Sequence, residues 1–276
     1  MKLRHRKQEG IPVLKLPPVR LHPVLTALRN HEFDRNGFKG EVVSLFSRDL
    51  PEKSVFRGMA VPSLRALGLM VGFEAELRLS SDGALVVTDC DQGSFRAMAA
   101  ILVEIEREHG LDGPWRSRAA QREAIVNALC AVDSGAGRAT AETRRRAQRW
   151  MAYLEHFRVF AAQASGLCVR QRLGALGLVS LQEFARRLLE AYRTAVPNCI
   201  GEVAVPVDQL RRDVGASFLS DGVFVTRRRF DMLLGRALAR QLRSVDLHRS
   251  MGAGEQLFQW RGGAFEALSL RRDRDV

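Results

Sequence analysis

Most of the chain carries apolar residues at the spacing of an amphipathic helix. In its centre, Ala147, Trp150, Met151 and Leu154 recur at i, i+3, i+4 and i+7, and Thr140 stands where a helix N-cap is expected. The same periodicity predicts further helices, over 42–50, 63–67, 92–109, 118–132, 180–196, 207–214 and 227–243. The expected fold class is therefore mainly α.

Between these helices, three segments alternate apolar and polar residues around a turn, which predicts β-hairpins. The predicted strand pairs are 76–80 with 84–87 around Ser81-Asp82-Gly83, 158–162 with 167–171 around 163–166, and 245–249 with 256–260, with 265–270 as a last strand or turn. Each predicted hairpin follows a predicted helix. The expected order is thus helices and then a small hairpin, three times along the chain.

A helix with an arginine face followed by a hairpin resembles the recognition helix and wing of a winged-helix (winged helix-turn-helix) DNA-binding domain. Earlier in the chain, LRALGLM followed by LRLSSDGALVV resembles the end of many bacterial winged helices. The resemblance implies two or three winged-helix modules in tandem. The corresponding division is a basic, proline-containing arm at 1–40 and modules at 41–113, 114–178 and 179–276. One mixed helical domain with incidental hairpins stays open as the alternative.

Charge is unevenly distributed along the 276 residues, whose formal net charge of +12 favours a polyanionic partner, nucleic acid before membrane. The arm at 1–40 has nine basic and three acidic residues, and its four prolines predict that it forms no regular element. It either lies on DNA, or is a tail or a strap on a partner subunit. Residues 41–113 carry seven basic and twelve acidic residues, which favours docking on protein, whereas 114–200 carry fourteen basic and six acidic residues, which favours DNA.

The candidate DNA-reading residues lie on the central helix, opposite its apolar face. At about 100° per residue, Arg145 and Arg149 point directly away from that face, with Gln148 beside them and Arg144 and Arg146 on the flanks. A B-DNA major groove accepts one α-helix, and arginine reaches guanine O6 and N7 or a phosphate from it. Further candidates lie on the hairpin and on two other helices: Arg170 and Arg172, Arg227, Arg228 and Arg229, and Arg65.

The sequence contains no enzymatic motif: there is no phosphate loop, HExxH, GxSxG or GxGxxG pattern. A nuclease whose carboxylates lie far apart in the sequence stays open. The four cysteines contain no CxxC pair, which predicts neither a zinc site nor a disulfide framework, and no cofactor, metal or small-molecule ligand is indicated. Without a long apolar run or a signal-peptide pattern, a cytoplasmic, nucleoid-associated protein with no membrane partner is expected.

The function that these patterns favour is non-enzymatic binding of double-stranded DNA. The acidic second segment and the arm further indicate a protein partner or self-association through 1–113. We therefore expect the DNA-recognition subunit of a larger bacterial assembly that serves defence, a mobile element or replication. A free-standing transcription regulator and a winged-helix scaffold that binds protein without DNA are the open alternatives.

Overall fold

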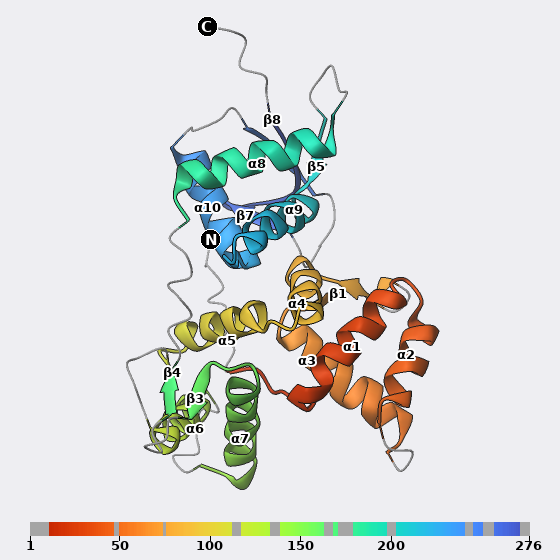
Figure 1. Cartoon of the computed structure of the whole chain (residues 1–276), viewed down its shortest axis with the longest axis vertical. Coiled ribbons are helices and arrows are strands. Elements are labelled where there is room, and N and C mark those ends of the chain that lie inside the picture. The colour runs from red at the N-terminus through yellow and green to blue at the C-terminus, as the bar shows by residue number, and fades with distance from the viewer. Residues whose placement is uncertain are drawn as a thin grey trace, which may run out of the picture.

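The computed structural model describes residues 11–46, 50–73, 76–111, 117–132, 139–162, 168–170, 179–197, 203–240, 245–250 and 257–270 (Figure 1). For residues 132, 160–162 and 168–170 it describes the backbone. Within these ranges lie ten α-helices, one π-helical segment and eight short strands, so the expected mainly helical fold with small antiparallel sheets is confirmed. The helices are α1 Pro18–Asn30, α2 Arg35–Ser44, η1 Ser54–Ala60, α3 Val61–Ala66, α4 Ser81–Asp91, α5 Arg96–Glu108, α6 Arg118–Val132, α7 Ala141–His156, α8 Leu181–Ala195, α9 Val207–Ser220 and α10 Arg227–Ala239. The strands are β1 Met70–Val71, β2 Arg78–Leu79, β3 Phe160–Ala162, β4 Cys168–Arg170, β5 Val205–Pro206, β6 Val245–Arg249, β7 Phe258–Trp260 and β8 Gly263–Leu270.

Two hydrophobic cores divide the described residues. The N-terminal body (11–159) has one core, to which buried side chains of α1, α5 and α7 all contribute. The C-terminal body (179–270) has its own core, built from α8, α9, α10 and the sheet around β8. Figure 1 shows the C-terminal body above α4 and α5, with α6 and α7 at the opposite end. The predicted boundary near 113 therefore does not separate two cores.

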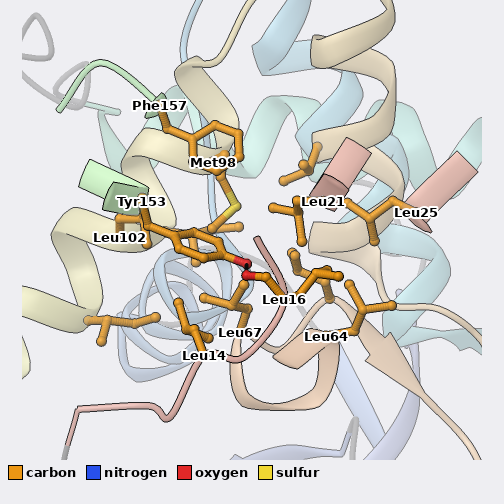
Figure 2. Packing of buried hydrophobic residues seen from close by; sticks show 14 of the residues in the cluster. Leu14, Leu16, Leu21, Leu25, Leu64, Leu67, Met98, Leu102, Tyr153 and Phe157 are labelled. Carbon is orange, nitrogen blue, oxygen red and sulfur yellow. Dashed lines mark hydrogen bonds between the residues drawn. The ribbon is translucent and has the colours of Figure 1, made fainter. Parts of the chain in front are cut away.

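Residues 11–16, the N-terminal strap, run through the middle of the N-terminal body. The backbone N–H groups of Lys15 and Leu16 donate to the Ser63 hydroxyl at 3.0 and 3.1 Å, and the Tyr153 hydroxyl donates to the Leu16 carbonyl at 2.9 Å. Figure 2 shows Leu14 and Leu16 among buried side chains that include Leu67 and Tyr153. The strap thus ties α3 to α7, which stand about ninety residues apart in the sequence.

The prediction that prolines exclude regular structure from the arm is wrong for its described part. Helix α1 begins with Pro18, whose missing N–H costs nothing in the first turn, and it tolerates Pro23 in its interior. Its side chains Leu21, Val24 and Leu25 are fully buried at helical spacing. Helix α2 follows directly. Residues 1–10 lie outside the described residues.

The first predicted hairpin is also wrong in part, because Ser81-Asp82-Gly83 begins helix α4 instead of forming a turn. The Ser80 hydroxyl accepts the Gly83 N–H at 2.9 Å, as an N-cap does. The predicted strand at 84–87 is therefore helical. Strand β2 does fall within the predicted strand at 76–80, but it pairs with β1, Met70 opposite Leu79.

In the C-terminal body, β5 and β6 flank β8 in an antiparallel sheet, and β7 also pairs with β8. The predicted pairing of 245–249 with 256–260 is wrong. The reason is the two-residue turn between β7 and β8, where Arg261 and Gly262 have φ of 44° and 79°, as a tight hairpin requires. Three predicted helices also have different limits: the 42–50 helix is Arg35–Ser44, the 207–214 helix extends to Ser220, and the 227–243 helix ends at Ala239.

We expect Tyr153→Phe to lower the free energy of unfolding by about 1–3 kcal/mol, because the buried Leu16 carbonyl loses its donor. Hydrogen exchange of the Lys15 and Leu16 amides should become faster. Tyr192→Phe is the matched control, since its hydroxyl donates to Val203 in the C-terminal body. Unchanged exchange of the strap in Tyr153→Phe would show that this hydrogen bond does not hold it.

Candidate nucleic-acid interface

Helix α7 forms where the sequence predicts it. The Thr140 hydroxyl accepts the Thr143 N–H at 3.1 Å and caps the helix. All four residues of the predicted apolar face are buried: Ala147, Trp150, Met151 and Leu154. The helix is therefore fixed in orientation, with its opposite face turned to solvent.

The solvent face of α7 carries Arg144, Arg145, Gln148 and Arg149, all of them exposed, while Arg146 is half-buried. In the part of the chain that the structure describes, none of the guanidinium groups of Arg144, Arg145 and Arg149 forms an ion pair. These three positive charges lie within two helical turns, on a surface available to an anion.

A β-hairpin follows α7, as predicted. Arg158, with φ 57°, ends the connection from the helix, and Phe160–Ala162 then pairs antiparallel with Cys168–Arg170. Of the two predicted hairpin contacts, Arg170 is the last residue of β4, and its side chain lies outside the described part of the chain, as does Arg172. The structure thus places the backbone of the hairpin beside the basic helix and leaves the contribution of its arginines as a prediction.

Helix α10, the second candidate helix, begins at the boundary between the two bodies. Thr226 caps it as predicted, accepting the Arg229 N–H at 3.2 Å. The same hydroxyl donates to Glu104 of α5 at 2.7 Å. Burial lowers the pKa of the Arg229 guanidinium, and Glu104 opposes this effect. The first turn of α10 therefore faces α5.

The other two candidate arginines of α10 meet acids of the N-terminal body as well. The backbone N–H of Arg227 donates to the Asp82 carboxyl group of α4 at 2.8 Å, and the Arg228 side chain forms an ion pair with Glu108 of α5. Burial lowers the pKa of the Arg227 guanidinium. In this conformation Arg227, Arg228 and Arg229 are thus engaged within the chain, unlike the arginines of α7.

A buried ion pair that the sequence analysis did not predict joins α9 to α10. The Arg211 side chain is 0% exposed, and its Nε and Nη2 donate to Asp231 Oδ1 at 2.9 and 2.7 Å. Because a buried charge is costly without a partner, this pair fixes the relative position of the two helices. Its members lie twenty residues apart on different helices, so the sequence contains no local signal for it.

Arg65, the remaining candidate, lies on α3 and is half-buried. Its Nη2 donates to the Gly72 carbonyl at 2.7 Å, and its guanidinium lies 4.7 Å from the centre of the Phe73 ring. It lines a pocket of about 450 Å³ together with Arg35 and Arg57. Sequence reasoning missed those two arginines; the eight-residue spacing of Arg57 and Arg65, close to two helical turns, was a usable signal.

The acids of the predicted first module are largely engaged inside the chain. Asp82, Glu104 and Glu108 contact α10, as described above. Asp91 forms an ion pair with Arg29 and a hydrogen bond with His22, both of α1. Their positions show why a net negative charge over 41–113 need not produce an acidic outer surface.

Burial raises the pKa of Asp82 to about 7. The N–H donated by Arg227 opposes this shift, nearby Glu104 adds to it, and the guanidinium groups of Arg227 and Arg211 oppose it. The pKa of Glu104 is itself raised, mainly by burial. The contact between the bodies thus contains carboxyl groups that are harder to ionise than in water.

No group of side chains that could hold a metal ion occurs among the described residues. In the same ranges, no helix is both long and apolar enough to cross a membrane. Burial raises the pKa of the Cys90 thiol to about 12, so this cysteine stays protonated at neutral pH. Comparisons of the chain with protein-family models, with curated proteins and with solved structures returned no match.

The raised pKa of Asp82 predicts a pH-dependent stability. Between pH 4 and 7 the folded state holds a proton that the unfolded state has released, so the free energy of unfolding falls as pH rises through this range. Asp82→Asn keeps an acceptor for the Arg227 N–H and removes the titration. As the pH rises from 5 to 8, we expect the free energy of unfolding of Asp82→Asn to increase relative to that of the parent protein by on the order of a few kcal/mol.

Calorimetric unfolding at both pH values checks this expectation. Glu104 titrates in the same direction and remains in the variant, so part of the pH dependence persists. Identical pH dependence in the two proteins would contradict the assignment to Asp82.

Proposed function

We propose that the chain is a non-enzymatic, double-stranded-DNA-binding protein that contacts the duplex through the outer face of α7. The observation that supports this function is the set of guanidinium groups of Arg144, Arg145 and Arg149, which form no ion pair with any described residue and lie on a helix whose other face is anchored in a core. Contacts from such arginines to phosphates supply affinity that falls with salt. Arg145, Gln148 and Arg149 are the candidates for contact with base edges.

The order of the elements supports winged-helix units. The C-terminal body runs α8, β5, α9, α10, β6, β7 and β8, with β8 between β5 and β6 in the sheet and β7 also paired with β8. Helices α5, α6 and α7 precede the β3–β4 hairpin, and α1, α2 and the η1–α3 segment precede the β1–β2 hairpin. We therefore propose three tandem winged helices, with α7 as recognition helix and β3–β4 as wing of the second. This division moves α5 from the first predicted module to the second.

The N-terminal body also has features that suit a protein partner. Phe33 and Phe73 are 59% and 61% exposed, and Phe73 lines the arginine pocket that contains Arg65. Exposed aromatic rings beside arginines are common at protein interfaces. We therefore favour a DNA-recognition subunit of a larger bacterial assembly over a free-standing transcription regulator. The same rings support the second candidate function, a protein-interaction scaffold that does not bind DNA.

The central test is the double variant Arg145→Ala/Arg149→Ala. We expect its affinity for a random duplex of about 30 base pairs to fall at least tenfold at low salt, because two cationic contacts are lost. The slope of log affinity against log salt should decrease by about 2. Fluorescence anisotropy over a salt series, with unlabelled single-stranded and duplex competitors, measures both quantities.

Arg186→Ala/Arg193→Ala is the matched control, since it removes two exposed arginines from α8 of the C-terminal body. Its affinity should stay within about twofold of the parent protein. A folded Arg145→Ala/Arg149→Ala variant that binds DNA like the parent would refute the proposed role of α7. If the parent protein itself shows no duplex binding at low salt, the scaffold function becomes the better supported one.

A further inference from the structure

The contact between the two bodies covers the end of α10 that the proposed winged-helix arrangement would turn toward DNA. In recognition helices the N-terminal residues contact base edges, and the backbone N–H groups at a helix N-terminus suit phosphate. At this position α10 carries three consecutive arginines, Arg227, Arg228 and Arg229. Arg227 and Arg229 are half-buried, and Arg228, whose side chain is 59% exposed, pairs with Glu108 of the N-terminal body.

Carboxyl groups of the N-terminal body contact the first turn of α10. Asp82 accepts the Arg227 N–H, the first free donor of the helix, at 2.8 Å. Glu108 pairs with the Arg228 side chain, and Glu104 accepts the hydroxyl of the Thr226 cap at 2.7 Å. Three acids from α4 and α5 thus converge on one turn of α10, where negative charge is favoured by the helix dipole.

Apolar packing holds the bodies together beside this cluster. Helix α9 lies against α4, where Gly215 is so close to Leu85 that an added Cβ would stand 2.6 Å from the Leu85 Cδ1. Phe224, in the connection between α9 and α10, is buried in the core of the N-terminal body. The contact therefore combines a charged cluster with an apolar anchor, both on the face of the C-terminal body that carries the start of α10.

The contact is not built for stability alone. Burial of Asp82 and Glu104 disfavours their ionised forms, as their raised pKa values indicate, so keeping these acids in the contact costs free energy. Apolar residues of similar size would fill the same space without that cost. Placing acids opposite a run of arginines is instead suited to excluding another polyanion from the same surface.

We propose that this contact is autoinhibitory: the acids of α4 and α5 block the DNA-binding end of α10, which contacts the duplex when the two bodies separate. The proposal rests on the proposed DNA-binding function. DNA and the N-terminal body compete for one surface, so weakening the contact strengthens DNA binding. In the closed form, α7 still presents its exposed arginines to solvent.

The first experiment compares two charge reversals of equal size. Glu108→Lys replaces the partner of Arg228 and should open the contact, whereas Glu190→Lys removes a partner of Arg186 on α8, away from the contact. The two glutamates are similarly exposed, 44% and 54%. We expect duplex affinity to rise about tenfold more in Glu108→Lys than in Glu190→Lys. Equal gains in the two variants would overturn the proposal.

A second variant opens the contact without changing charge. Gly215→Leu places a side chain against Leu85 and should push α9 away from α4. Its duplex affinity should also rise about tenfold. Adding Arg227→Ala and Arg228→Ala should abolish the gain in both opened variants and should lower the affinity of the parent protein by a smaller factor. If the two arginine changes lower duplex affinity by the same factor in the parent protein, Glu108→Lys and Gly215→Leu, the N-terminal body does not block α10.

Hydrogen exchange reports the opening without DNA. The first turn of α10, including the Arg227 amide, should exchange faster in Glu108→Lys and in Gly215→Leu than in Glu190→Lys. The opened variants could exchange faster and yet bind the duplex no more tightly than the parent protein, while Arg145→Ala/Arg149→Ala still weakens binding. That outcome would refute autoinhibition and leave the proposed function intact. Absence of duplex binding in every variant, the opened ones included, would refute both.

Discussion

The hydrogen bond from Tyr153 to the Leu16 carbonyl joins the elements on which the proposed interface depends. It anchors α7 to the N-terminal strap, and the strap in turn receives its position from the Ser63 hydroxyl of α3. A basic helix can make specific contacts with DNA only if its own orientation is fixed. The orientation of α7 depends on the N-terminal strap, which precedes the helix by well over a hundred residues in the sequence. Helix α7 is therefore part of the continuous N-terminal body and not a separate DNA-binding unit.

The arginines of this protein fall into groups with different physical states, although the sequence presents them alike. Those of α7 are exposed and lack ion pairs among the described residues, whereas Arg228 of α10 pairs with Glu108 and Arg211 is fully buried against Asp231. Net charge by segment therefore overstates the acidity available to a partner from 41–113 and the basicity available from α10. The difference between the two helices follows from where acids of other segments lie.

Periodicity predicted the central helix, its cap and its hairpin correctly, because those features depend on residues close together in the sequence. The segment around Asp82 was misread because a serine-aspartate-glycine run serves a turn and a helix start equally well, and the apolar run after it is buried on more than one side. The spacing of Leu21 and Leu25 is that of a helix, but the prolines of the same segment led to the prediction that it forms no regular element. The contact of Asp82 with Arg227, across 145 residues, had no local signal at all.

The way the two cores divide the chain decides how it can be dissected. A cut near residue 113 would leave the apolar sides of α5 and α7 on separate fragments, each with part of the shared core exposed to water. A fragment beginning near residue 179 would keep a complete core. It would lose the N-terminal body that buries Phe224 and supplies the acids facing α10. Such a fragment is the natural candidate for solubility trials, and it would present its arginine-rich helix end uncovered.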